Sequence, residues 1–153
     1  MSTVAIPTLK ALLRRPEDQD WFEGALPGEL VRYRVRGEQV NGAYSIVESI
    51  FPPLAGPPLH IHENEDEVFR ILEASLSFLC KGDRFDAPAG SMVVIRKNAQ
   101  HTWKNIMDAP ARVLVTFAPG GAEGMFAAIS GQPVNQIVEI AARFGCRVVG
   151  PPL

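Results

Sequence analysis

Three histidines are the residues of this chain whose type and spacing most clearly suggest chemistry. His60 and His62 are two positions apart, and the third, His101, follows much later. Side chains alternate between the two faces of a β-strand, so residues two apart share a face. Two neutral imidazoles side by side make a natural pair of cis ligands for a transition metal. The alternative to a metal site is that the three histidines have unrelated roles, and a further ligand residue would favour the metal site.

Glu67 is the candidate for that further ligand. It follows the histidine pair by an odd offset, which would place it on the opposite face of one flat strand. The polar segment 63–66 offers a bend, and a new strand after it can turn Glu67 inward. Glu67, Phe69 and Ile71 then share the inward face. Arg70 is expected to point outward.

A bound cation would explain a carboxylate among apolar neighbours. An unpaired buried charge costs several kcal/mol. Glu67 with three imidazoles, that of His101 included, makes a ligand set for one divalent transition metal ion: zinc, nickel, copper, iron or manganese. Glu63, Glu65 and Asp66 are expected to lie in the bend and to face solvent. Glu67 is then the one carboxylate near the open coordination position, and it is the candidate general base.

Turn-forming residues divide the middle of the chain into short apolar stretches. They are Gly37, Asn41-Gly42, Pro52-Pro53, Gly56-Pro57-Pro58, Gly82-Asp83, Pro88-Ala89-Gly90 and Asn98. The stretches predict strands over residues 30–35, 43–51, 59–62, 67–72, 75–80, 91–95, 101–105 and 111–117. Many short strands at this spacing are typical of an antiparallel sandwich or barrel. A hairpin at Gly82-Asp83 is expected to join 75–80 to a short segment at 84–87.

The two ends of the chain show helical patterns instead. Residues 8–15 predict a short helix that stops before Pro16. Residues 122–130 and 134–144 predict two more helices, and Gly145 is well placed to end the second.

The composition indicates one ordinary globular domain. Hydrophobic residues make up 46% of the 153 residues, charged residues 21%, and the net charge is -2. With no repeat and no linker, we expect a single all-β domain over 1–153, with a barrel core at about 43–117 and a helical extension at about 120–145.

Composition also bounds the partners. The chain has no basic block for nucleic acid and no apolar run long enough to span a membrane. Its N-terminal charges follow the apolar stretch, the reverse of an export signal. Cys80 and Cys146 are far apart and form no Cys-x-x-Cys pair. A disulfide between them is the alternative to a reduced, cytoplasmic chain, which is the simpler expectation. The expected partner is a small molecule.

Around the candidate ligands, the sequence resembles the cupin superfamily. The first cupin motif is Gly, five residues, His-x-His, three or four residues, Glu, six residues, Gly. Here His60-Ile-His62 is followed by four residues, Glu67, six residues and Ala74. The second motif is Gly, five residues, Pro-x-Gly, two residues, His, three residues, Asn. Here Gly90 is followed by five residues, Arg96-Lys97-Asn98, two residues, His101, three residues and Asn105. The resemblance covers roughly residues 43–117.

Four positions depart from the motifs. Gly56 precedes the first histidine by the wrong spacing. Asn98 replaces a glycine, but Asn tolerates a positive φ well, so the turn should survive. Ala74 also replaces a glycine and takes a positive φ only at a cost, so its turn is expected to differ in shape. Arg96 replaces a proline; it is either a solvated surface residue or a rim charge that steers an anionic substrate.

The resemblance implies a cupin barrel, that is, a double-stranded β-helix or jelly roll, with short C-terminal helices. It also implies a metal held in the barrel mouth by three histidines and one glutamate. Residues 57–69 and 117–121 are similar to small quercetin dioxygenase-like proteins. That similarity implies a metal-dependent dioxygenase for a small aromatic or enolic, flavonol-like substrate, with Glu67 as both ligand and base. The alternatives are a sensor without turnover and a metal-dependent isomerase or lyase.

Apolar residues on the expected inward faces predict the walls of a substrate pocket. Trp103 shares the face of His101, two positions away. Further candidates are Phe69, Ile71, Met92, Val94 and Phe117; for the last three, the sequence does not decide which face of the strand they occupy. Most of these residues would belong to the hydrophobic core, and those near the open coordination position of the metal would form an apolar pocket.

A homodimer is also expected. Strand edges need cover, and the N-terminal part of the chain carries Trp21, Phe22, Tyr33 and Val35. These are more apolar groups than a peripheral strand of a monomer should show. The alternative is that they pack on their own barrel.

Overall fold

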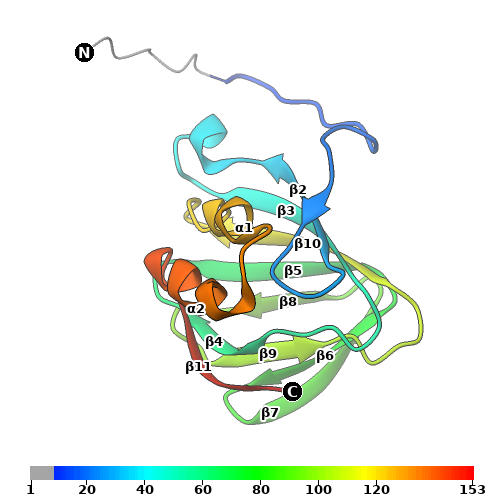
Figure 1. The fold of residues 1–153 in the computed structure, drawn as a ribbon. Coiled ribbons are helices and arrows are strands. Elements are labelled where there is room, and N and C mark those ends of the chain that lie inside the picture. Colours follow the sequence, from blue (N-terminus) through cyan, green and yellow to red (C-terminus); the bar gives the residue numbers. More distant parts are fainter. Residues whose placement is uncertain (1–8) are drawn as a thin grey trace.

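A computed structural model describes residues 9–153 of the chain. Strands make up most of its regular secondary structure, with two α-helices near the C-terminus (Figure 1). In order, the elements are β1 (Phe22–Glu23), β2 (Leu30–Val35), the 3-10 helix η1 (Gly37–Val40), β3 (Ser45–Phe51), β4 (Pro58–His62), β5 (Asp66–Glu73), β6 (Ser75–Cys80), β7 (Asp83–Pro88), β8 (Met92–Ile95), β9 (His101–Lys104), β10 (Ala111–Ala118), α1 (Gly124–Ile129), α2 (Val134–Arg143) and β11 (Cys146–Pro152). All eight predicted strands form, with ends that differ from the prediction by at most two residues.

Two antiparallel sheets form a cupin jelly roll, as predicted. The first has the order β1-β2-β3-β10-β5-β8 and the second the order β11-β4-β9-β6-β7. In Figure 1 the first sheet lies above the second. Non-consecutive strands are neighbours throughout, so residues far apart in sequence, such as those of β4 and β9, meet in one sheet.

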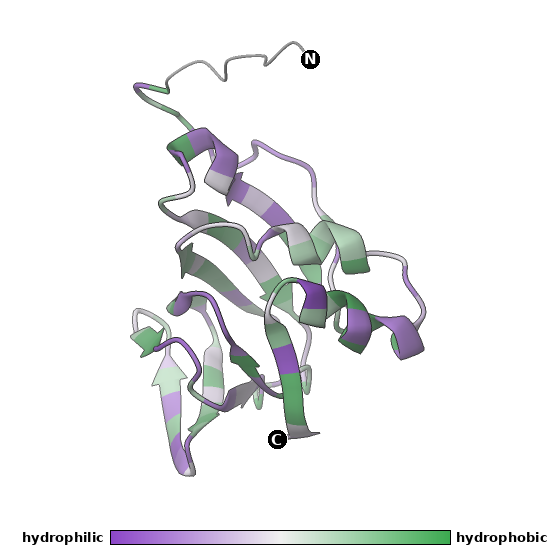
Figure 2. Cartoon of the chain, turned by 90° about the vertical axis from the view of Figure 1, so that its left-hand side faces the viewer, coloured by the Kyte–Doolittle hydropathy of each residue, from purple (hydrophilic) through white to green (hydrophobic). Residues whose placement is uncertain are grey.

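The core lies on the inward faces of these strands. Along β10, Ala111, Val113, Val115 and Phe117 are buried and the residues between them are less so. Figure 2 shows a related pattern, in which hydrophobic and hydrophilic residues alternate along strands. Burial of large apolar side chains, about 1.5–3 kcal/mol each, supplies the main driving force for the barrel.

The helix predicted for residues 8–15 is wrong. Residues 9–15 have no regular secondary structure, and Thr8 lies outside the described residues. So short a helix is marginal by itself, and this segment instead bonds to β2. Arg14 Nε donates to the Arg34 carbonyl at 2.9 Å, and Arg34 Nη2 donates to the Arg15 carbonyl at 2.8 Å.

Both C-terminal helices form, and a strand that was not predicted follows them. Gly145 ends α2 with φ +77°, the conformation expected of a glycine stop. The chain then returns as β11 along β4, pairing Cys146 with His62 and Val148 with His60. Because β11 is an edge strand, the sheet tolerates its prolines. No helix among residues 9–153 is long and apolar enough to cross a membrane.

The two motif turns keep their glycine-like backbone. Asn98 has φ +66°, as predicted. The expectation that the Ala74 turn changes shape is wrong, because Ala74 itself has φ +64°. It adopts the left-handed conformation at a cost of about 1–2 kcal/mol. The sharp link between β5 and β6 is therefore retained without a glycine.

Candidate metal centre

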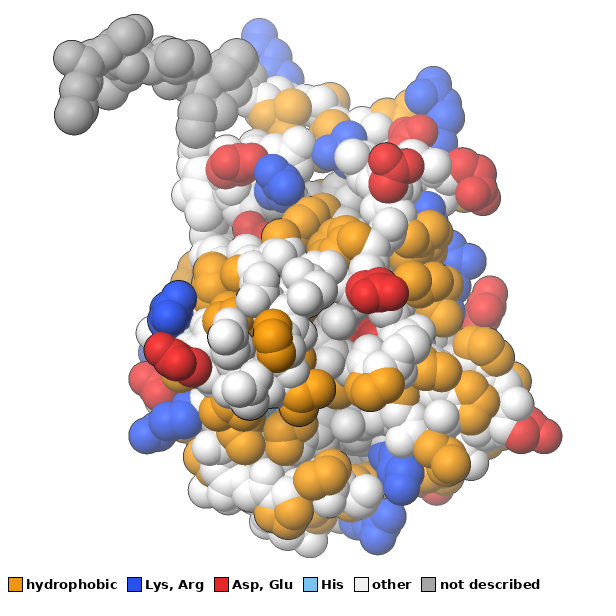
Figure 3. All heavy atoms as spheres, in the orientation of Figure 1, with side chains coloured by type: hydrophobic (Ala, Val, Ile, Leu, Met, Phe, Trp, Pro, Cys, Tyr) orange, Lys and Arg blue, Asp and Glu red, His pale blue; other side chains and the backbone are white. Residues whose placement is uncertain are grey.

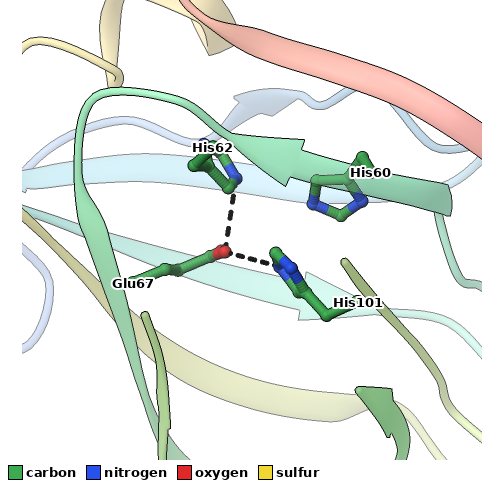
Figure 4. A group of neighbouring side chains, drawn as sticks. All are labelled: His60, His62, Glu67 and His101. Atoms are coloured by element: carbon green, nitrogen blue, oxygen red, sulfur yellow. Dashed lines mark hydrogen bonds and ion pairs between the residues drawn. The ribbon is translucent and has the colours of Figure 1, made fainter. Parts of the chain in front are cut away.

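The four predicted ligands come together inside the barrel from three strands. His60 and His62 lie on β4, Glu67 on β5 and His101 on β9, and their side chains converge (Figure 4). His60 and His101 are direct partners across the β4–β9 ladder. Alternation within β4 gives both of its histidines the same face. The bend at 63–65 restarts the pleat so that Glu67 also points inward.

All four side chains are buried. Almost no histidine surface is visible on the face drawn in Figure 3. As predicted, Phe69 and Ile71 share the inward face of Glu67, whereas Arg70 is exposed. One ligand atom from each of the four residues lies within 4.8 Å of the others. A charged carboxylate among apolar walls requires a compensating cation.

The contacts of Glu67 show where that cation belongs. His101 Nδ1 lies 2.9 Å from the carbonyl oxygen of Ala99, an acceptor, so this nitrogen carries the hydrogen. In a neutral ring, His101 Nε2 then directs a lone pair at Glu67 Oε2, 2.9 Å away. His62 Nε2 is 3.2 Å from the same oxygen. Facing lone pairs at such distances repel unless a proton or a metal ion lies between them.

The other two Nδ1 atoms are held in the same way. His60 Nδ1 donates to the carbonyl of Pro58 at 2.8 Å. His62 Nδ1 donates to Oε1 of Glu65, also at 2.8 Å. Each ring is therefore oriented by a partner behind it, and each Nε2 is left for the interior. Ordered partners of this kind fix the tautomer of metal-binding histidines.

Charge in the metal-free cluster is unevenly shared. Burial lowers the pKa of His60 to about 4, and the nearby His101 adds to the fall, so His60 is neutral at pH 7. Burial also lowers the pKa of His62, but the carboxylates of Glu67 and Glu65 raise it by more, to about 10. Burial raises the pKa of Glu67, yet the His62 charge and the hydrogen bonds of both histidines hold it well below its usual range.

The donor set fits a divalent transition metal ion. Ligand atoms about 2.1 Å from one ion, at right angles to each other, lie about 3 Å apart. Glu67 Oε2 has that separation, 2.9 and 3.2 Å, from two imidazole nitrogens. Three imidazoles and a carboxylate leave one or two positions open on an ion that takes five or six ligands.

Glu65 is the functional residue that the sequence argument placed wrongly. It was expected to face solvent, yet its side chain is only 4% exposed and it bonds to His62. Glu63 lies at the surface as expected and pairs with Arg147. Asp66 does not lie in the bend but begins β5, where it is half-buried. The missed signal is the three-residue offset from His62, which lets a carboxylate reach back across the bend.

The predicted pocket residues divide into two groups. Phe69, Ile71, Trp103 and Phe117 are buried in the barrel interior, and the Trp103 ring centre lies 5.7 Å from that of His60. Met92 and Val94, on β8, are 62% and 59% exposed, so the prediction that these two residues line the interior is wrong. They lie on the outward face of β8, while their neighbours Val93 and Ile95 point inward.

Trp103 carries an unpaired polar group into this interior. Its indole Nε1 is buried and has no hydrogen-bond partner among the described residues. A buried N–H without a partner costs about 1–3 kcal/mol. A bound molecule with an acceptor oxygen would satisfy it.

Arg96 and the two cysteines are not part of the ligand cluster. Arg96 is exposed, and its Nε lies 3.2 Å from Oδ1 of Asp66, which also accepts the backbone N–H of Lys97. This arginine thus ties the start of β5 to the turn before β9. Cys80 and Cys146 are both free thiols, and burial raises the pKa of Cys146 to about 12, which keeps it protonated.

A surface groove of about 570 Å³ lies between η1 and the start of α1. Its lining includes Tyr33, Arg36, Gly121 and Glu123, and none of the four ligand residues. The centre inside the barrel, and not this groove, holds the groups that could do chemistry.

Comparison with known proteins supports the cupin assignment. Residues 47–117, just under half of the chain, match the family model for the cupin domain. That range includes all four ligand residues. No curated protein matches the chain by sequence.

Solved structures give the same fold with different activities in their names. A predicted oxalate decarboxylase from Thermotoga maritima is 19% identical, with a TM-score of 0.64 over 71% of this chain and 99% of that one. The polyketide cyclase RemF from Streptomyces resistomycificus is 18% identical, with a TM-score of 0.59 over 70% of this chain and 80% of that one. A sugar phosphate isomerase of the cupin superfamily from Silicibacter pomeroyi is 19% identical, with a TM-score of 0.57 over 66% and 71%. At these identities the likeness shows the fold alone.

Proposed function

From a chain with the cupin fold and a buried cluster of three histidines and one glutamate, we propose a metal-dependent enzyme. It acts on a small molecule that carries an enolic or aromatic hydroxyl, and the first reaction to test is dioxygenation of a flavonol-like substrate. The observation that carries this proposal is the carboxylate of Glu67 held 2.9 and 3.2 Å from two imidazoles in an apolar interior.

The ion, when bound, supplies Lewis acidity and acidifies a hydroxyl held beside it. The chain contributes the rest. His60, His62 and His101 present their Nε2 atoms at fixed angles, because each Nδ1 is held from behind. Glu67 is the carboxylate that can take the proton of a hydroxyl at the open position. Trp103, whose ring centre lies 5.7 Å from that of His60, and Phe69, 5.0 Å from Trp103, are buried and make the interior beside the histidines apolar.

A non-redox reaction is the second candidate. The names of the structural neighbours include a decarboxylase, a cyclase and an isomerase. All three reaction types can use the same proton-accepting carboxylate beside a metal ion. A sensor that binds its ligand without turnover is the remaining alternative. For any of these, we propose the cytoplasm as the location, where the two free thiols stay reduced.

Reconstitution experiments separate the candidates. Metal-free protein is refilled with iron, manganese or nickel and mixed with a flavonol, and dioxygen consumption is followed with an electrode. Consumption that requires both metal and flavonol supports the dioxygenase. A product that still forms when dioxygen is excluded would shift the assignment to an isomerase or lyase, and tight binding without any product would make the protein a sensor.

A further inference from the structure

One of the three histidine supports differs from the others in charge. His60 and His101 are oriented by neutral backbone carbonyls, those of Pro58 and Ala99. His62 is oriented by the carboxylate of Glu65 at 2.8 Å. The two carboxylates, Glu65 and Glu67, thus lie behind and in front of the same imidazole.

Neither carboxylate has a basic side chain to balance it. Among residues 9–153, Glu65 and Glu67 form ion pairs only with histidines of the cluster. Arg32 is the one arginine or lysine of this part of the chain that is buried, and it is bound to Glu48 at 2.9 Å. Among the described residues, no arginine or lysine therefore balances the charges of these two buried carboxylates.

We propose that Glu65 is a positioning and specificity-determining residue that makes the loaded centre electrically neutral. A divalent ion contributes +2, Glu67 and Glu65 contribute -2, and three neutral imidazoles contribute nothing. The centre therefore favours uncharged hydroxyl or carbonyl ligands and disfavours ligands that arrive as carboxylates or phosphates. This inference rests on the proposed metal function and narrows its substrate class.

Two consequences follow from the placement of Glu65. Buried charges interact strongly because water and salt do not screen them. The negative charge of Glu65 therefore repels any anion that enters the open coordination position of the metal ion. Its hydrogen bond also makes His62 a stronger donor, so its removal should weaken metal binding about 10- to 100-fold, as for other carboxylates that support a ligand histidine.

Cobalt(II) is a suitable probe, because its visible spectrum reports both occupancy and added ligands. Wild type, Glu65→Gln, Glu65→Asp and the surface control Glu63→Gln are titrated with cobalt against a chelator. Each loaded protein is then titrated with azide, an anion, and with imidazole, a neutral ligand. Glu65→Gln should bind cobalt at least about tenfold more weakly, yet bind azide about tenfold more tightly. Imidazole affinity should change less than about threefold.

The variants separate charge from shape. Glu65→Asp keeps the charge, so its azide affinity should stay near wild type even though its cobalt affinity falls. Glu63→Gln should match wild type in both titrations, since Glu63 pairs with Arg147 at the surface. If wild type binds no cobalt, the proposed function itself fails. If wild type binds cobalt but Glu65→Gln shows unchanged azide affinity, or Glu65→Asp gains as much as Glu65→Gln, the metal function stands and the role of Glu65 is refuted.

Discussion

Glu67 lies between two imidazoles, and its two possible roles make different predictions. As a ligand only, its replacement by Gln should reduce activity in proportion to the metal lost. As a base too, Glu67→Gln should lose about 10²- to 10⁴-fold in turnover per bound metal atom. The measurement is turnover divided by metal content, with whichever substrate the reconstitution experiments identify. Turnover per metal within about threefold of wild type would assign proton transfer to another group.

Metal binding should depend on pH through His62. The pKa of His62 in the metal-free protein is raised from 6.5 to about 10. Its protonated form therefore stabilises the metal-free fold fully below pH 6.5, and that stabilisation is lost as pH rises through about 10. A metal ion must displace this proton. His60 is already neutral and Glu67 already ionised, so neither adds a proton to the exchange.

Apparent metal affinity should thus rise about tenfold per pH unit between pH 6.5 and 8.5. Chelator competition at several pH values gives this slope, and calorimetry in two buffers of different ionisation enthalpy counts the proton directly. An affinity that is flat over this range would show that His62 is not protonated in the metal-free protein.

At the scale of single elements, the Ala74 turn offers a test of backbone strain. Ala74 has φ +64°, so Ala74→Gly should stabilise the protein by about 0.5–1 kcal/mol as the left-handed conformation becomes free of strain. Ala87, buried in β7, is the matched control, and Ala87→Gly should destabilise. Urea unfolding measures both. A loss of stability in Ala74→Gly equal to that in Ala87→Gly would contradict the account.

Strand positions and metal ligands were predictable because they depend on local signals. Turn residues bound each strand, and the two-residue spacing of His60 and His62 fixes their common face. The side-chain direction of β8 was not predictable in this way. Met92, Val93, Val94 and Ile95 are all apolar, so alternation of hydropathy could not tell which pair faces inward.

Of two other errors, one comes from a contact that is distant in sequence and the other from an offset of three residues. The strand β11 contains Gly150 and two prolines, which locally argue against a strand, and it forms because β4 offers a free edge. Glu65 is polar and lies in a bend, which locally indicates exposure. Its burial comes with the hydrogen bond to His62, three residues earlier, an offset that the expectation of exposure left out.

For the molecule as a whole, the homodimer stays a prediction, but its expected surface changes. Trp21 lies 4.2 Å beneath the guanidinium of Arg32, and the Phe22 and Tyr33 rings are 5.3 Å apart. These residues pack on their own barrel. The apolar groups left uncovered include Met92 and Val94, on an edge strand of the first sheet.

We therefore propose that the outer face of β8 pairs with the same face of a second copy, in the isologous arrangement common to dimers. Light scattering should give twice the chain mass of 16.7 kDa. Val94→Lys should shift the protein toward monomer, whereas Val134→Lys, at a more exposed apolar position on α2, should not. A wild-type mass near 16.7 kDa would refute the dimer.

The metal content of the purified protein tests the central claim most directly. Wild type, His62→Ala, His101→Ala and Arg70→Ala are dialysed against the free concentration of divalent metal that just fills wild type, and metal per chain is measured by elemental analysis. We predict one ion per chain in wild type and in Arg70→Ala, whose side chain lies on the exposed face. His62→Ala and His101→Ala should each bind metal more than about tenfold more weakly, since each loses a direct bond to the ion. Equal occupancy in all four proteins would show that this cluster does not hold the metal.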